Sequence, residues 1–184
     1  YNMSTVQPSV KGILQAKKNL EGISEVTPLK LNQILSDETG AKVFLKREDL
    51  QAVRSYKIRG AYNFISQLSA VEKKQGVVCS SAGNHAQGFA YSCNLLKIKG
   101  IVFMPTPTPK QKVEAVRRVG KNYIEIVLSG DTYDDAKSAA LKYVHSHNKI
   151  FVPPFDHKLI VEGQGTVGIE ILEQIGKKKI DYLF

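Results

Sequence analysis

One lysine, Lys57, stands in the stretch SYKIRGAYN, near the start of a segment whose apolar residues recur at helical spacing. A lysine amine can attack an aldehyde or move a proton only when it is neutral. With an unperturbed pKa near 10.4, very few lysine side chains are neutral at pH 7. Burial and a nearby cation, here Arg54 or Arg59, would lower that pKa. Lys57 is therefore either a solvated helix-face cation or a reactive amine, and the local residues leave both open.

A second stretch, VVCSSAGNHAQG, places small and polar residues between a predicted strand and a predicted helix. The strand is expected to end at Cys79, and the helix to begin near Asn84 or His85. Main-chain N–H groups at such a turn attract an anion, for example a carboxylate. Ser81 and Asn84 offer side-chain donors, and His85 is a third candidate. The alternative is a capped helix without a ligand, because Ser and Asn are common N-cap residues.

Three glycines in EGQGTVGIE, at positions 163, 165 and 168, form the letter pattern G-x-G-x-x-G. A dinucleotide site requires this pattern directly after a strand, with an acidic residue at the end of the next strand. The preceding PPFDHKLIVE contains a proline pair, which makes a poor central strand. We therefore interpret these glycines as positions of close helix packing.

The rest of the chain alternates short apolar runs with amphipathic stretches, and these elements must position both motifs. Gly40 is expected to end a helix and Asp131 to cap one. Buried-type strands that alternate with helices predict a parallel α/β fold, in which ligands bind at the carboxyl ends of the strands. Strands are expected at 41–49, 76–81, 99–105, 122–128, 149–154 and from 179, and helices at 8–20, 31–40, 55–68, 83–96, 109–120, 131–147 and 167–176.

The composition is that of an ordinary globular protein, with 42% hydrophobic and 23% charged residues. A formal net charge of +9 raises the possibility of nucleic-acid binding. The basic residues, however, are mostly lysines spread along the chain, and no recognition motif accompanies them. Their densest cluster, Lys177 to Lys179, follows Gly176 and is expected to be a solvated helix end. We expect no nucleic-acid partner.

No apolar run approaches the ~20 residues of a membrane helix. The N-terminal YNMSTVQPSV lacks the basic start and the apolar stretch of a secretion signal. We therefore expect a cytoplasmic protein without membrane contact. Cys79 and Cys93 are expected to be reduced and buried. The positions of His145, His147 and His157 do not suit a metal site, and none is expected.

Taken together, SYKIRGAYN and SSAGNHAQG resemble the paired signature of the fold-type-II pyridoxal-phosphate enzymes, and they are most similar to the threonine dehydratase branch. FLKREDLQ, VFMPTPTPKQKVEAVR and FVPPFDHKLIVEGQGT resemble the same branch, in the same order. The resemblance covers the chain from about Val6 to Phe184. It implies an α/β architecture similar to the tryptophan synthase β subunit, with two parallel-sheet lobes, of which the larger is incomplete here.

The resemblance also implies roles for the residues of the two motifs. Lys57 would carry pyridoxal 5'-phosphate as an imine, and Asn84 would hydrogen bond to the phenolic oxygen of this cofactor. Tyr56 would wall the cofactor pocket. The substrate carboxylate would bind to the turn formed by Ser81, Ala82, Gly83, Asn84 and His85, which agrees with the anion site inferred from the residues themselves.

The implied reaction is the α,β-elimination of L-threonine to 2-oxobutanoate and ammonia, the first step of isoleucine biosynthesis. Lys57 would act as the base that removes the α-proton. The alternatives on the same fold are a serine dehydratase, acting on L-serine, and a serine racemase. Racemases of this fold have a serine where this chain has Ala82, and a methyl group cannot move a proton, which favours elimination. A non-catalytic basic binding domain is the alternative outside the enzymes.

By the family pattern, residues 1–76 begin the large lobe and carry the lysine, 77–148 form the small lobe with the carboxylate turn, and 149–184 return to the large lobe. The chain would then be the N-terminal part of a catalytic domain, since the Gly-rich loop for the cofactor phosphate would follow Phe184. Alone it is expected to be incomplete for activity. Relatives imply a homodimer or homotetramer and allosteric control. The choice between a biosynthetic and a degradative role stays open.

Overall fold

A computed structural model describes residues 7–184 of the chain. Val6, from which the family resemblance runs, and most of the stretch used to predict the absence of a secretion signal lie outside the described residues.

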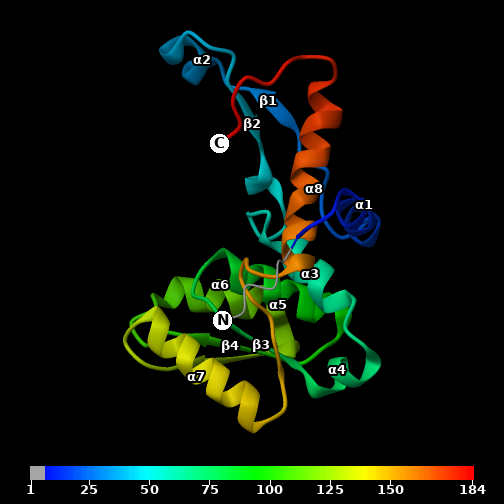
Figure 1. Ribbon diagram of the computed structural model, residues 1–184. Coiled ribbons are helices and arrows are strands. Elements are labelled where there is room, and N and C mark those ends of the chain that lie inside the picture. The colour runs from blue at the N-terminus through cyan, green and yellow to red at the C-terminus, as the bar shows by residue number, and fades with distance from the viewer. Residues whose placement is uncertain (1–6) are drawn as a thin grey trace.

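A four-stranded parallel sheet lies at the centre of the lower part of the molecule in Figure 1. Its strands are β3 (Val77–Ser80), β4 (Gly100–Met104), β5 (Ile124–Leu128) and β6 (Ile150–Phe151), and their spatial order is β5-β4-β3-β6. β3 and β4 are buried at every position, as expected for parallel strands that are covered on both faces. The predicted parallel α/β fold is confirmed.

Helices cover the two faces of this sheet unequally. α3 (Lys57–Ser66), α5 (Asn84–Leu96) and α6 (Lys110–Gly120) pack on the face that carries the larger core. α7 (Tyr133–Ser146) covers the other face and packs against β3 and β4. Successive residues of a strand point to opposite faces, so β3 contributes alternately to the two cores.

The predicted state of the cysteines is confirmed, because Cys79 of β3 and Cys93 of α5 are both free and buried. Both belong to the core that lies between the sheet, α3, α5 and α6. Burial raises the pKa of both thiols, in Cys93 to a value far above the physiological range. They therefore act as small apolar core residues.

The strand order reverses beside β3. The chain runs outward from β3 to β4 and β5, and α7 then returns it to β6 on the other side of β3. In open α/β sheets, ligand crevices form at the carboxyl ends of strands where the order reverses. The loops that follow β3 and β6 flank this point.

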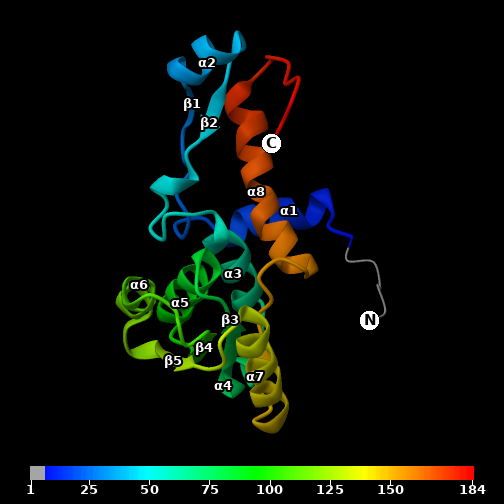
Figure 2. The same ribbon diagram turned by 90° about the vertical axis from the view of Figure 1, so that its left-hand side faces the viewer.

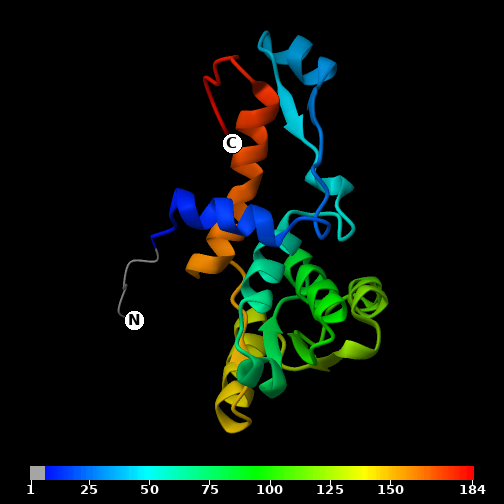
Figure 3. The same cartoon turned by 90° about the vertical axis from the view of Figure 1, so that its right-hand side faces the viewer.

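An antiparallel pair, β1 (Leu29–Leu31) and β2 (Phe44–Lys46), forms an arm with α2 (Gln33–Thr39) between its strands. Figures 1 and 2 show this arm projecting away from the parallel sheet. α8 (Lys158–Ile175) begins near the sheet and ends alongside the arm, and α1 (Val10–Asn19) crosses α8 (Figure 3).

Three shorter elements complete the structure. α4 (Ala70–Gln75) precedes β3 and begins with a capping box between Ser69 and Glu72. η1 (Glu48–Leu50) and η2 (Lys121–Tyr123) are single 3₁₀ turns. The sequence predicted neither α4 nor β1, because each is too short to show a clear period.

Local signals account for most helix ends. Gly40, at a φ of +66°, ends α2 as predicted, in a conformation that glycine adopts without steric cost. The prediction that Asp131 caps α7 is wrong. Thr132 occupies that position and accepts the N–H of Asp135, whose carboxylate in turn accepts the N–H of Thr132. Asp131 also has an acidic residue three positions on, Asp134, so the pattern alone does not choose between the two caps.

The G-x-G-x-x-G glycines lie inside α8, which begins at Lys158 rather than near residue 167. A Cβ on Gly163 would lie 2.4 Å from the carbonyl oxygen of Arg59 in α3, and one on Gly165 would lie 3.0 Å from Ile13. The interpretation as close helix packing is therefore confirmed for these two positions.

The end of the chain differs from the prediction. Residues 179–184 do not form a strand, because within residues 7–184 they meet no strand with which to pair. Lys177 to Lys179 are exposed after Gly176, as expected for a solvated helix end. The lobe boundaries at 76 and 148 stay a prediction, although β6 shows that residues 150–151 share a sheet with β3.

Candidate active site

Three segments converge at the point where the strand order reverses. They are the turn after β3, the loop from 152 to 157 that joins β6 to α8, and the first turn of α3. The predicted site residues lie in the turn after β3 (81–85) and at the first turn of α3 (Lys57), except Tyr56, which directly precedes α3. Sequence reasoning assigned no role to the loop between β6 and α8.

Lys57 is the first residue of α3, and its side chain is partly buried. Its Nζ donates a hydrogen bond to the carbonyl oxygen of Pro154, at 3.0 Å, and lies 5.3 Å from the centroid of the Tyr56 ring. Burial lowers the pKa of Lys57. This amine therefore has a neutral acceptor, and it loses its proton more readily than a solvated lysine.

The expectation that Arg54 or Arg59 lowers the pKa of Lys57 is wrong, because burial is the cause of the shift. Arg59 is buried, and Glu48 and Glu170 compensate its charge. Arg54 is exposed to water, which screens its charge.

Gly88 of α5 allows α3 to come close enough to place Lys57. A Cβ at this position would lie 2.8 Å from the carbonyl carbon of Lys57 and 2.9 Å from the nitrogen of Ile58. Any side chain here would push α3 away from α5. The contact between the two backbones brings the lysine to the turn that precedes α5.

The turn after β3 leaves the start of α5 open. Gly83 occupies the N-cap position and has no side chain with which to accept a hydrogen bond. Ser81 Oγ accepts the N–H of Gly83 at 3.2 Å, and Asn84 is exposed as the first helical residue. The alternative of a helix capped by Ser or Asn is therefore wrong. The N–H groups of the first turn of α5 therefore have no side-chain cap.

His85 does not offer its side chain to a ligand, which corrects the expectation of a third donor. The ring is only 4% exposed, and Nε2 lies 3.2 Å from the carbonyl oxygen of Val152. Burial lowers the pKa of His85 to about 4; the contact with Val152 opposes this effect and the charge of Lys57 adds to it. His85 is neutral at physiological pH and joins α5 to the loop after β6.

The remaining predicted residues lie around this point. Ala82 is partly buried against the larger core, and Gly83 is exposed. Tyr56 is 40% exposed, so its predicted place in a cofactor wall stays a prediction. The structure thus brings Lys57 to the turn of 81–85, which the sequence alone did not require.

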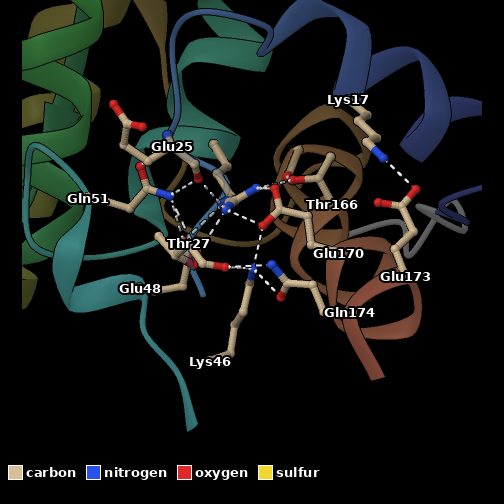
Figure 4. A network of polar contacts seen from close by, with 12 residues as sticks. Lys17, Glu25, Thr27, Lys46, Glu48, Gln51, Thr166, Glu170, Glu173 and Gln174 are labelled. Atoms are coloured by element: carbon tan, nitrogen blue, oxygen red, sulfur yellow. Dashed lines mark hydrogen bonds and ion pairs between the residues drawn. The ribbon is translucent and has the colours of Figure 1, made fainter. Parts of the chain in front are cut away.

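A network of buried charges behind Lys57 was not predicted. Figure 4 shows the side chains of Glu48, Glu170 and Lys46 in this network. Lys46 donates to Glu170, and Arg59 donates to both Glu48 and Glu170. The motif FLKREDLQ contains two of these residues, but nothing in their spacing indicates which side chains meet. Backbone acceptors such as the carbonyls of Val152 and Pro154 leave no signal in a sequence at all.

Other features carry less chemistry. A hollow of about 390 Å³ lies at the other ends of the strands, between Lys99, Tyr123 and Lys149, and none of the predicted site residues lines it. Within residues 7–184, no three His, Cys, Asp or Glu side chains gather as a metal site would require.

None of the helices within residues 7–184 is both long enough and apolar enough to cross a bilayer.

Comparison with known proteins gives a consistent result. A family model described as pyridoxal-phosphate dependent enzyme matches residues 21–184. The biosynthetic L-threonine dehydratase of Halalkalibacterium halodurans is 51% identical over 175 residues, which are 95% of this chain and 42% of that protein. The chain thus spans less than half the length of this curated relative.

Solved structures show the same likeness. The processed form of threonine deaminase isoform 2 from Solanum lycopersicum has a TM-score of 0.81 and 39% identity, over 91% of this chain and 48% of that one. Maize serine racemase has a TM-score of 0.85 and 29% identity, over 91% of this chain and 50% of that one.

Proposed function

The chain belongs to the family of pyridoxal-phosphate-dependent enzymes, and on that premise we propose that it is part of a threonine dehydratase, a lyase that converts L-threonine to 2-oxobutanoate and ammonia. The family match and the similarity to solved threonine deaminases confirm the predicted fold-type-II architecture. The relatives named as biosynthetic L-threonine dehydratases support the substrate and a place in isoleucine biosynthesis.

The residues present fit the aldehyde of pyridoxal phosphate. An amine must be neutral to bond to an aldehyde, and Lys57 is a partly buried amine whose pKa is lowered. Its one hydrogen-bond acceptor, within the described residues, is the neutral carbonyl of Pro154. Asn84 lies exposed at the start of α5, where its amide is free to donate to the phenolic oxygen. We assign these two residues to the cofactor, with Tyr56 beside them.

The observation that carries the proposal is this placement of Lys57 at the reversal point of the sheet, next to an uncapped helix start. The N–H groups of the turn from Ser81 to His85 would bind and orient the substrate carboxylate. Pyridoxal phosphate, when bound, supplies an aldehyde and a ring that accepts the electron pair left by the departing proton.

Lys57 Nζ is the group that moves this proton. Free of covalent attachment, it would accept the proton from the α-carbon of the substrate, at a site where burial keeps its pKa low. The carbonyl of Pro154 would hold the resulting ammonium by a hydrogen bond. Lys57 therefore both anchors the cofactor and serves as the base.

Ala82 distinguishes elimination from racemisation. Racemisation requires a second proton donor on the face opposite Lys57, and the methyl group of Ala82 has no proton to give. The similarity to maize serine racemase keeps that activity as the second candidate. We place elimination first because the turn lacks the hydroxyl at this position.

A paired assay of the full-length protein tests the proposal. With pyridoxal phosphate added, we expect a visible absorption band and the formation of 2-oxobutanoate from L-threonine. Lys57→Ala should abolish the band and reduce the rate by roughly 10³-fold or more. Lys99→Ala is the matched control, because Lys99 Nζ also donates to a backbone carbonyl, that of Asn122 at 2.9 Å, and should leave both unchanged.

Two outcomes would contradict the proposal. A band and a rate that survive Lys57→Ala would exclude Lys57 as the anchor, and the absence of any band in the wild type would favour a non-catalytic binding domain. Formation of D-serine from L-serine in excess of 2-oxo acid would favour the racemase.

The finer expectations belong to the same proposal. We propose a cytoplasmic homodimer or homotetramer under allosteric control, which accepts L-serine as a second substrate. The biosynthetic role of the relatives supports regulation by an end product. Size-exclusion chromatography of the full-length protein and assays with isoleucine added would check the assembly and the regulation.

A further inference from the structure

Two cations leave the first turn of α3 in opposite directions. Lys57 and Arg59 are two residues apart, and at about 100° per residue their side chains diverge by about 200° around the helix axis. Lys57 points to the loop after β6, where its amine donates to the carbonyl oxygen of Pro154. Arg59 points to the other side, where it is 1% exposed. Any rotation of α3 that displaces one side chain therefore displaces the other.

The guanidinium of Arg59 is fully engaged. Its Nε and Nη2 donate to the two oxygens of Glu48, at 2.9 and 2.8 Å. Its Nη1 donates to Thr166 Oγ1 at 3.1 Å and to Glu170, and Nη2 also donates to Glu170 at 3.0 Å and to the carbonyl oxygen of Glu25 at 3.1 Å. These partners come from η1, from α8 and from the loop before β1, so hydrogen bonds to three separate segments hold one side chain of α3.

Lys46 completes a group that we call the buried quartet: Arg59, Lys46, Glu48 and Glu170. Lys46 Nζ donates to Glu170 and to the carbonyl oxygen of Thr27, and the side chains of Lys46 and Glu170 are 7% and 4% exposed (Figure 4). Burial alone would raise the pKa of Glu170, but the hydrogen bonds from Arg59 and Lys46 outweigh it and lower that pKa. Two cations and two anions compensate each other, so the quartet is neutral as a unit.

The backbone beside Arg59 is held as firmly as its side chain. Gly163 of α8 lies against the carbonyl of Arg59, and Gly60 of α3 lies against the carbonyl of Ile160, each too close to admit a Cβ. The quartet and this glycine contact together leave α3 little freedom to rotate or slide. Lys57, by contrast, has a single hydrogen bond of its own.

We propose that Arg59 is a positioning residue for Lys57, which fixes the rotation of α3, chiefly through its two-pronged contact with Glu48, and so holds the Lys57 amine against the loop after β6. The inference rests on the proposed function of Lys57, although its geometry does not. Misplacement of a reacting group by about 1 Å can cost roughly 100-fold in rate. A long side chain on a rotating helix moves by more than that.

Two matched double variants of the full-length protein test the proposal. Arg59→Met with Glu48→Gln removes the pair that holds α3. Lys46→Met with Glu170→Gln removes the other pair, and with it the ion pair between Arg59 and Glu170, but leaves the fork between Arg59 and Glu48 intact. Each variant loses one cation and one anion, so neither leaves an uncompensated buried charge. Arg59→Lys is a milder third variant, which keeps the charge but loses the two-pronged geometry.

The first readout uses the protein without cofactor. Acetic anhydride labels neutral amines, and the pH profile of labelling at the Lys57 peptide reports the pKa of that amine alone. The titratable groups near it are His85 on α5 and Tyr56 beside it, and none of the variants changes them. We expect the midpoint to rise toward the ordinary lysine value in the Arg59→Met double variant, less so in Arg59→Lys, and to stay in place in the Lys46→Met double variant.

The second readout is the rate at which borohydride fixes added pyridoxal phosphate to Lys57. We expect a loss of about 100-fold in the Arg59→Met double variant and at most a few-fold loss in the Lys46→Met double variant. Equal profiles and rates in the wild type and in a folded Arg59→Met double variant would overturn the inference. So would an equal effect of both double variants, since the quartet would then act through general stability.

Failure of the proposed function is distinguishable from failure of the inference. If the wild type fixes no pyridoxal phosphate at Lys57, the proposed function is wrong, whereas the labelling profile still reports whether Arg59 controls the surroundings of the amine.

Discussion

The first turn of α3 carries a cation on each side, Arg59 and Lys57, and the surroundings of the two cations differ. On one side, the three guanidinium nitrogens of Arg59 donate to oxygens from three segments, and these acceptors include the carboxylates of Glu48 and Glu170. On the other side, Lys57 has one carbonyl as acceptor. A cation with anionic partners stays charged and stabilises the fold, whereas a partly buried cation with a neutral partner gives up its proton easily. Burial lowers the pKa of both cations, and the number and charge of their partners decide whether that effect is outweighed, as in Arg59, or stands, as in Lys57.

The largest expected difference between the two cations is in their contribution to the free energy of unfolding. Arg59→Met alone should lower the free energy of unfolding by about 3–5 kcal/mol, because it leaves Glu48 and Glu170 buried with one cation between them. Lys57→Met should change it by less than about 1 kcal/mol, since no carboxylate loses a partner. Urea unfolding at pH 7 measures both. Equal losses would mean that the crevice side contributes as much to the fold as the quartet does.

On the Lys57 side of α3, acid should lower the stability of the fold through His85. The folded protein holds His85 neutral down to about pH 4, while the unfolded chain protonates it near pH 6.5. As the pH falls between these values, protons bind preferentially to the unfolded chain, so stability decreases, by about 3 kcal/mol from this residue.

His85→Gln supplies the control for this acid effect. Its amide can donate to the carbonyl of Val152 as the ring does, and it does not titrate, so the variant should lose less stability between pH 6.5 and 4 than the wild type. NMR titration of the His85 ring provides a direct check. A midpoint near 6.5 in the folded protein would contradict the expected burial.

The smallest effect concerns the loop that leads to Lys57. Arg54 has a φ of +60°, a conformation that costs about 1–2 kcal/mol for residues with a Cβ. Arg54→Gly removes this cost but adds freedom to the unfolded chain, so we expect a net gain in stability of less than about 1 kcal/mol. Ala52→Gly, at an exposed position of the same loop, should only destabilise. If both variants destabilise equally, the loop before Lys57 stores no strain.

The sequence was sufficient for elements whose signal is local. The buried runs of β3 and β4 and the αL glycine at the end of α2 follow from rules that apply within a few residues of the chain. The cap of α7 was assigned one residue too early, because Asp131 and Thr132 each have an acidic residue three positions on, Asp134 and Asp135, and the sequence pattern does not choose between them. The strand expected from residue 179 requires a partner, and strand pairing is not a local property.

In the candidate site, too, the sequence identified some residues correctly and assigned wrong roles to others. Lys57 and the turn of 81–85 could be found from residue types and a family resemblance. The role expected of Arg59 was wrong because a charge near in sequence points away in space, toward Glu170, which lies 111 positions further along the chain. The expectation that the His85 side chain donates to a ligand was wrong, because burial, which depends on the packing of α5, decides whether a histidine ring faces a ligand.

The loop after β6 has a practical consequence for mutagenesis. It holds Lys57 and His85 through main-chain oxygens, those of Pro154 and Val152. An alanine scan deletes side chains and leaves both acceptor oxygens in place, so it would not report the contribution of these two contacts. Replacing the peptide bond that follows Pro154 by an ester, through semisynthesis, would weaken the acceptor itself and so expose a contribution that genetics cannot see.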